Sequence, residues 1–128
     1  MEIKNNINLK DHLTMRLGGQ AKYMVEINCK EDIKNAYQYA EDHGLKVFIL
    51  GGGSNTLATD KGFDGLVMLM KIKGTEVIAE DEDSITFKIG AGEILDDIVK
   101  KSVEMHLTGI EAMSMIPGTI GAAPVQNV

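Results

Sequence analysis

A run of three glycines followed by two small polar residues is the feature of this sequence best suited to binding chemistry. Residues 47–50 are apolar and lead directly into Gly51, Gly52, Gly53, Ser54 and Asn55. Glycine has no side chain and tolerates positive φ, so successive backbone N–H groups can point into one concavity and bind an anion such as phosphate. Ser54 and Asn55 would add side-chain donors at its rim.

The same five residues could form only a flexible turn, because glycine-rich turns are common. Two named phosphate-binding motifs are excluded. No Gly-Lys-Ser or Gly-Lys-Thr follows the glycines, which rules out a P-loop, and Ser54 and Thr56 interrupt any Gly-x-Gly-x-x-Gly pattern. A phosphate cradle and a plain turn both remain open at this position.

A second loop of small and apolar residues lies near the end of the sequence, between Pro117 and Pro124, which fix φ on both flanks. It can lie close to a flat or charged ligand, or it can be a tight turn between packed elements. Two such loops in one small chain favour a bipartite site for a large phosphate-containing ligand. The candidate binding residues are Leu50, Gly51, Gly52, Gly53, Ser54, Asn55, Ile116, Pro117, Gly118, Thr119, Gly121 and Ala122.

Length and composition are those of one soluble globular domain. The 128 residues are 44% hydrophobic and 25% charged, which is enough apolar material for a core. No apolar run approaches the roughly 20 residues of a membrane span, and the first residues lack the apolar centre of a signal peptide. The single Cys29 excludes an internal disulfide and fits a reducing compartment, so we expect a cytoplasmic location and no membrane partner.

The charge pattern excludes one class of partner and indicates no metal site. A net charge of -6 argues against nucleic acid, whose binding depends on basic residues. It does not exclude a nucleotide, because salt screens charges beyond about 8–10 Å. The acidic residues 80–84 are predicted to be a solvated hairpin tip, and the three histidines lack metal-ligand spacing. Arg16 could contact a ligand phosphate or simply lie at the surface.

The elements that would position the first loop form a βαβ unit. In residues 21–27, Tyr23, Val25 and Ile27 alternate with Lys22, Met24 and Glu26, which predicts a strand, and Asn28 with Glu31 predicts a capping box. The following helix has an apolar stripe and ends at Gly44, and residues 47–50 are predicted to be a strand buried on both faces. A right-handed crossover places the loop at the mouth of a small parallel sheet. The stripe comprises Ile33, Ala36, Tyr37 and Ala40.

The rest of the chain changes character near Gly74. Residues 66–70 predict another buried strand, and residues 75–79 and 85–89 predict an antiparallel hairpin. A helix is predicted over 93–106, whereas residues 5–17 show no sustained period. We therefore expect two subdomains, residues 1–73 and 74–128. The helix residues predicted to face inward are Leu95, Ile98, Val99, Ser102 and Met105.

The motifs resemble those of a known family. TMRLGG at 14–19, GGGSN at 51–55, DKGFDG at 60–65 and IPGTIGAAPVQN at 116–127 are similar, in order and spacing, to the UDP-N-acetylenolpyruvoylglucosamine reductase (UDP-N-acetylmuramate dehydrogenase) family. The resemblance implies an α+β fold, the two-subdomain FAD-binding domain of the vanillyl-alcohol-oxidase type, with FAD between the subdomains. Residues 51–55 match the loop around the FAD pyrophosphate, and residues 116–122 match the loop along the diphosphate, ribityl chain and flavin. Ala122 stands where many members have glycine.

By the same resemblance, the full protein is a flavin-dependent oxidoreductase of peptidoglycan precursor synthesis, and hence of cell wall biogenesis, cell shape and cell division. NADPH reduces FAD, which then reduces UDP-N-acetylglucosamine enolpyruvate, a UDP-sugar, to UDP-N-acetylmuramate. The family's catalytic residues belong to later sequence, so we expect none here, a truncated second subdomain, and no turnover by this chain alone. The alternatives are a noncatalytic nucleotide- or flavin-binding module and another flavin oxidoreductase of the same superfamily.

Overall fold

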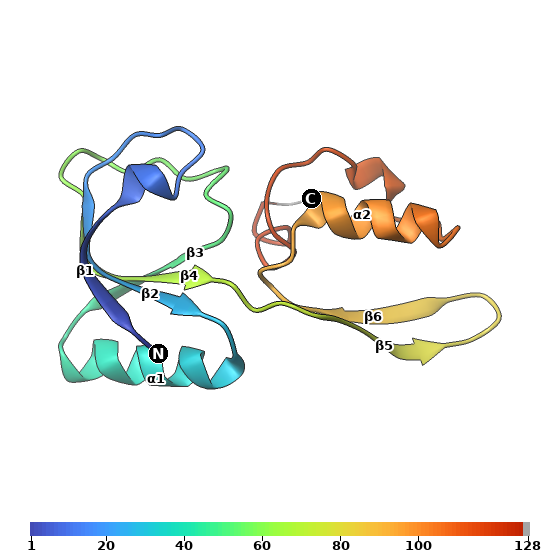
Figure 1. Cartoon of the computed structure of the whole chain (residues 1–128), viewed down its shortest axis with the longest axis horizontal. Helices are drawn as coiled ribbons and strands as arrows, with labels where there is room; N and C mark the ends of the chain where they lie inside the picture. The colour runs from blue at the N-terminus through green and yellow to red at the C-terminus, as the bar shows by residue number, and fades with distance from the viewer. Residues whose placement is uncertain (127–128) are drawn as a thin grey trace.

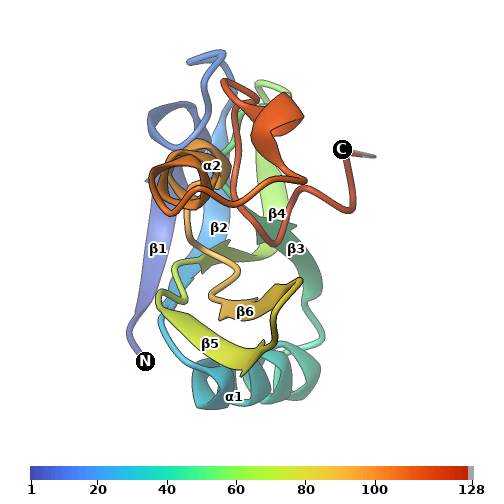
Figure 2. The ribbon, with the colours of Figure 1, turned by 90° about the vertical axis from the view of Figure 1, so that its right-hand side faces the viewer.

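Two β-sheets joined by a short connecting segment make up the structure (Figure 1). It is a computed structural model that describes residues 1–126, so Asn127, the last residue of the second motif, lies outside the described residues. In this part of the chain one sheet has four strands, in the order β1-β2-β4-β3, and the other has β5 and β6. Residues 71–74 link the two sheets, and Figure 2 shows the second half in front of the first sheet along the long axis.

The first half contains the predicted βαβ unit. Strands β2 and β3 each run parallel to β4, which lies between them, and helix α1 connects β2 to β3. Because parallel strands end at the same edge of a sheet, the residues that follow β3 and β4 meet at one edge. The elements are β1 (Ile3–Asn8), the short 3₁₀ helix η1 (Leu9–Asp11), β2 (Gln20–Ile27), α1 (Lys30–Asp42), β3 (Lys46–Leu50) and β4 (Phe63–Met70).

Strand β1 is an element that the sequence does not predict. It pairs antiparallel with β2 at the edge of the sheet, and it overlaps the segment whose sequence shows no helical or strand periodicity. Its sequence, IKNNIN, is mostly polar and exposed, and Asn6 adopts φ +52, which interrupts regular strand geometry. Pairing with β2 therefore defines this strand, rather than burial of an apolar face.

Strand β3 is not buried on both faces, so that prediction is wrong. It is the other edge of the sheet, and Ile49 is 53% exposed, whereas Leu50 is buried. Strand β4 takes a central position, and five of its residues, 65–69, are buried, which confirms the predicted buried strand at 66–70. An apolar run alone does not distinguish an edge strand from a central one.

Apolar residues pack on both faces of the first sheet. Helix α1 covers one face, and the segment that contains Leu9 and Leu13 covers the other. Met24 and Val25, on opposite faces of β2, are both buried for this reason. The buried residues of the α1 side are Val25, Ile27, Ala36, Ala40, Leu66 and Met68, and those of the other side are Leu9, Leu13, Ala21, Met24, Leu50, Val67 and Leu69.

Helix α1 begins one residue later than predicted. Its N-cap is Cys29 rather than Asn28, and Asp32 rather than Glu31 completes the capping box. The Asp32 carboxylate accepts hydrogen bonds from the backbone N–H groups of Asn28 (2.9 Å) and Cys29 (3.2 Å). The bond from Asn28 is the main cause of the lowered pKa of Asp32.

The predicted apolar stripe of α1 is correct except at Tyr37. Ala36 and Ala40 are buried and Ile33 packs against them, but Tyr37 is 46% exposed. Tyr39 packs against this core instead, with its ring edge-to-face against Tyr23 at a centroid distance of 6.0 Å. The helix ends as predicted, before Gly44 at φ +61.

The second half is a hairpin followed by a helix. Strands β5 (Thr75–Glu80) and β6 (Ile85–Ile89) pair antiparallel, which confirms the predicted hairpin. Helix α2 (Leu95–Glu104) is shorter than predicted, and Met105, expected to face inward, is 41% exposed beyond its end. The other predicted inward residues of α2 are buried. A second 3₁₀ helix, η2 (Glu111–Met113), leads into the second loop.

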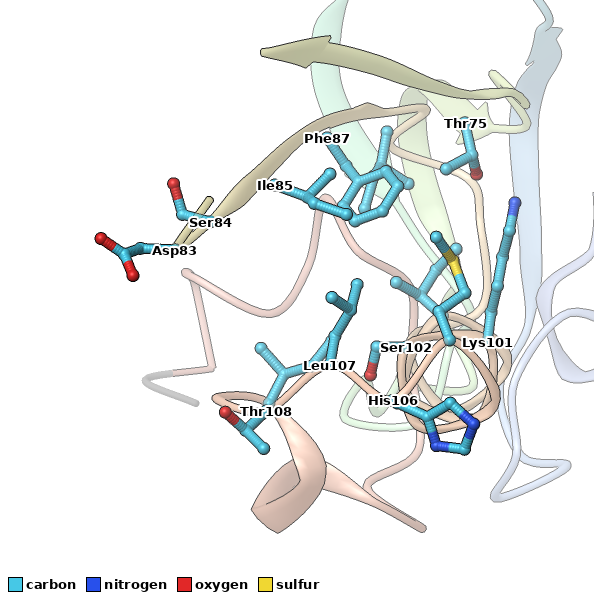
Figure 3. A pocket seen from close by; sticks show the side chains of 14 residues that line it. Thr75, Asp83, Ser84, Ile85, Phe87, Lys101, Ser102, His106, Leu107 and Thr108 are labelled. Atoms are coloured by element: carbon cyan, nitrogen blue, oxygen red, sulfur yellow. The ribbon is translucent and has the colours of Figure 1, made fainter. Parts of the chain in front are cut away.

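A cavity of about 460 Å³ lies between the hairpin and α2 (Figure 3). The side chains of Ile85 and Phe87 point from the hairpin toward Leu107, which follows α2. All residues that line this cavity lie between 75 and 110, so it includes neither loop of the candidate site. Among residues 1–126, no helix is both long and apolar enough to cross a bilayer.

Candidate cofactor-binding site

The first loop (residues 51–55) and the second loop (residues 116–122) lie against each other. Ser54 Oγ donates a hydrogen bond to the carbonyl oxygen of Pro117 at 3.3 Å. A methyl group on Gly51 would lie 2.9 Å from Thr119 Oγ1, and one on Gly52 would lie 3.6 Å from Gly118 Cα. The structure therefore brings together the two loops that the sequence singles out.

The first loop is positioned by the end of β3 and by residues 12–14. Leu50 is buried and pairs with Leu69 of β4, so its side chain belongs to the core and its backbone sets where the loop starts. Gly53 has φ +71, and a side chain there would overlap the carbonyl oxygen of His12. The carbonyl oxygen of Gly53 also accepts a hydrogen bond from the N–H of Thr14 at 3.1 Å. Glycine is thus required at position 53 for both conformation and space.

The second loop runs antiparallel to the segment that precedes and begins α2. The N–H of Leu95 donates to the carbonyl oxygen of Gly118 (3.1 Å), and the N–H of Ile120 donates to that of Glu93 (2.8 Å). The N–H of Gly121 donates to Ala91 at 2.9 Å. A methyl group on Gly121 would lie 2.7 Å from Ala91 Cβ, so the close approach needs glycine.

Unpaired backbone N–H groups are gathered where the loops meet. Within residues 1–126, no protein oxygen accepts a hydrogen bond from the N–H groups of residues 51–55, Gly118 or Thr119. Gly53 and Thr119 are buried residues, and buried N–H groups are nearly always paired. The arrangement fits an anionic ligand that supplies the missing acceptors, such as a diphosphate.

Basic side chains lie beside the first loop. A cavity of about 440 Å³ is bounded by Gly51 and Gly52 together with Arg16, Lys71 and His12, and Asp11 adds one carboxylate. Arg16 has φ +55, an uncommon conformation for a residue other than glycine. The structure thus places Arg16, ambiguous in the sequence, beside the candidate anion site.

Lys71 is a residue that sequence reasoning missed. It follows the carboxyl end of β4, next to the carboxyl end of β3 where the first loop begins. Parallel strands bring the residues after their carboxyl ends to one edge of a sheet, and this rule could have pointed to Lys71. It could be applied only if β3 and β4 were known to be neighbours.

Glu93 ties the connecting segment to the second loop. Its carboxylate accepts hydrogen bonds from the N–H of Gly74 (2.7 Å) and from Lys73 Nζ (3.2 Å), while its backbone oxygen accepts from Ile120. The bond from Gly74 is the main cause of the lowered pKa of Glu93. The residue therefore links the sheet-to-sheet connection to one wall of the site.

The remaining predicted site residues lie at the edges of this arrangement. Asn55 is exposed, Ile116 is half-buried, and the methyl group of Ala122 lies beside Gly51. Within residues 1–126, no three His, Cys, Asp or Glu side chains come together in a way that could hold a metal ion.

Comparisons with known proteins show the family to which this chain belongs. The model of the family described as "FAD binding domain" matches residues 21–128. A UDP-N-acetylenolpyruvoylglucosamine reductase of Flavobacterium johnsoniae is 40% identical over 128 residues, which is 100% of this chain and 37% of the relative. The protein of the same name from Salinispora arenicola is 39% identical over 120 residues, 94% of this chain and 33% of the relative.

A solved structure shows the same fold. The crystal structure of UDP-N-acetylenolpyruvylglucosamine reductase from Thermus caldophilus superposes with a TM-score of 0.73 at 28% identity, covering 96% of this chain and 41% of that chain. The predicted α+β fold is confirmed, and the chain spans about a third to two fifths of the length of these relatives. The chain therefore belongs to the family of FAD binding domains and, as its motifs predict, resembles the UDP-N-acetylenolpyruvoylglucosamine reductases.

Proposed function

We propose that this chain is the FAD-binding portion of an NADPH-dependent reductase that converts UDP-N-acetylglucosamine enolpyruvate to UDP-N-acetylmuramate in peptidoglycan precursor synthesis. One observation carries the binding part of this proposal. Within residues 1–126, the N–H groups of residues 51–55, Gly118 and Thr119 have no protein acceptor, and the two loops that carry them lie against each other. The relatives' names support the reduction of UDP-N-acetylenolpyruvoylglucosamine, whereas NADPH and the product are what the resemblance of the motifs implies.

The chain's own residues would hold the diphosphate of FAD. The N–H groups of both loops would donate hydrogen bonds to its oxygens. Arg16 and Lys71, which line the cavity beside the first loop, would partly neutralise its roughly two negative charges. Bound FAD supplies hydride transfer, and the protein supplies binding and orientation. Residues 1–73 and 74–128 would act as two subdomains with the cofactor between them.

The wider role follows from the same proposal. NADPH as reductant, a UDP-sugar as substrate, a cytoplasmic location, and roles in cell wall biogenesis, cell shape and cell division belong to the full protein. We assign no catalytic residue within this chain and expect no substrate-dependent NADPH oxidation from it alone. Turnover at a rate typical of enzymes would contradict that expectation.

Titration of the wild-type chain with FAD, followed by quenching of flavin fluorescence, tests the proposal. Saturable binding is expected, with ADP competing and riboflavin binding more weakly because it lacks the diphosphate. A noncatalytic module that binds another nucleotide would give no saturable quenching of flavin fluorescence, and it would bind that nucleotide in a separate calorimetric titration. Equal affinity for FAD and riboflavin would show that the loops do not hold a diphosphate.

A further inference from the structure

The carboxylate of Asp96, in the first turn of α2, holds the residues that lead into the second loop. Asp96 Oδ1 accepts a hydrogen bond from the backbone N–H of Met115 at 2.7 Å and from Ser114 Oγ at 3.4 Å. Ser114 and Met115 directly precede Ile116, the first residue of the second loop. One side-chain oxygen thus anchors the start of the second loop to the helix.

Met115 needs an external anchor because of its conformation. Its φ is +64, a region that residues other than glycine rarely adopt and that persists only when the surroundings enforce it. Met115 is 86% exposed, so packing does not enforce it. Two hydrogen bonds hold the turn: the N–H of Ile116 donates to the carbonyl oxygen of Met113 at 3.3 Å, and the N–H of Met115 donates to Asp96, which ties the turn to helix α2.

Asp96 is itself held in place as a charged group. Lys100 Nζ lies 2.8 Å from Asp96 Oδ2, one helical turn further along α2, and the Asp96 side chain is 22% exposed. The hydrogen bond from Lys100, followed by that from the N–H of Met115, lowers the pKa of Asp96. Oδ2 of Asp96 thus pairs with Lys100 on the same helix, and Oδ1 accepts the hydrogen bonds from Ser114 and Met115.

We propose that Asp96 is a positioning residue for the cofactor site. By fixing the turn at Met115, it sets the direction in which the chain enters the second loop, and so aims the N–H groups of Gly118 and Thr119 at the diphosphate of a dinucleotide. This inference rests on the proposed function. It concerns the dinucleotide's diphosphate rather than its flavin ring.

The test compares Asp96→Ala and Asp96→Asn with Asp97→Ala, which removes the neighbouring exposed carboxylate of the same helical turn. Asp96→Ala should weaken FAD binding about tenfold, which is about 1.4 kcal/mol, and leave riboflavin affinity within about twofold. Asp96→Asn keeps an acceptor oxygen and should bind FAD within about threefold of wild type. Asp97→Ala should match wild type.

Several results would overturn the inference. The first is an Asp96→Ala variant that binds FAD as tightly as wild type. The second is a loss of FAD affinity in Asp97→Ala as large as that in Asp96→Ala. The third is an equal loss of FAD and riboflavin affinity in Asp96→Ala, which would indicate general unfolding. A measurement on the wild type needs no folded variant: the Met115 amide should exchange slowly with solvent at pH 7 despite its exposed side chain. Rapid exchange there would show that Asp96 does not hold it. Absence of FAD binding by wild type with a protected Met115 amide would instead contradict the proposed function.

Discussion

Ser54 and Pro117 are in direct contact through a hydrogen bond of 3.3 Å, although 63 positions separate them in the chain. The contact joins the loop after β3 to the loop after η2, and thus one half of the molecule to the other. Under the proposed function, both loops are needed to surround the diphosphate with donors. The candidate site therefore forms only when the two halves pack together. Because each loop lies in a different half, mutations can test each loop separately.

Gly52→Asp should abolish FAD binding while leaving the fold intact. Gly52 does not have positive φ, and a methyl group there meets its nearest neighbour at 3.6 Å, so aspartate fits. Its charge would lie near a diphosphate, and two unit charges at ~4 Å and an effective dielectric near 20 repel by about 4 kcal/mol, roughly three decades of affinity. Fluorescence titration measures the loss, and circular dichroism checks the fold.

Gly44→Asp is the matched control for this change. It adds the same charge at φ +61, where nothing lies within 4 Å of the new atom, and aspartate tolerates that conformation better than most residues. It should bind FAD like wild type. If Gly52→Asp also binds within tenfold of wild type, the first loop is only a turn.

Gly53→Ala should destabilise the fold more than Gly44→Ala. Both positions have positive φ, which costs about 1–2 kcal/mol for alanine, but only at Gly53 would the new methyl group overlap the His12 carbonyl oxygen. The free energies of unfolding in urea should therefore differ by more than about 1 kcal/mol between the two variants. Equal losses would mean that residues 12–14 do not brace the first loop.

Arg16→Ala should weaken FAD binding about tenfold, and the effect should shrink at high salt because screening reduces the attraction between separated charges. Arg16 lines the cavity beside Gly51 and Gly52. Lys10→Ala, which removes a cation from the same stretch of chain but not from this cavity, is the control and should leave affinity unchanged. A loss of equal size in both variants would indicate a nonspecific charge effect.

Glu93→Gln should reduce the dependence of stability on acid pH. The pKa of Glu93 is lowered in the fold, chiefly by the Gly74 N–H, so its contribution is present above its unfolded pKa of about 4.3 and is lost as pH falls through the lower folded value. Melting temperatures of wild type and variant should differ at pH 7 and converge below pH ~4. Glu82→Gln, on the exposed hairpin tip, should track wild type. A constant difference across this range would exclude the proposed linkage.

Local chemistry explains which predictions succeed. The position of the first loop could be predicted because three glycines after an apolar run end the strand, and the helix end at Gly44 and the hairpin are likewise encoded within a few residues. The sequence placed the capping box one residue too early because cysteine rarely caps a helix, which made Asn28 the expected N-cap. In the structure Cys29 is the N-cap, and Asp32 makes the hydrogen bonds expected of Glu31.

Tertiary contacts explain which predictions fail. β1 is polar and exists through its pairing with β2, and β3 looks buried in sequence but becomes an edge because β4 inserts between β2 and β3. Lys71 is placed at the candidate site by the strand order, and Asp96 by the return of the chain to α2. None of these relationships has a local signature in the sequence.

The connecting segment at residues 71–74 has a thermodynamic consequence under the proposed function. Only the short segment 71–74 connects the two sheets along the chain. A ligand held by both loops would therefore act as a noncovalent cross-link between the halves. Mass action then makes melting depend on free ligand, and a ligand at 100 times its Kd adds about 2.7 kcal/mol to the free energy of unfolding. The melting curve of this chain would thus serve as a gauge of free cofactor concentration, with both halves gaining or losing order together.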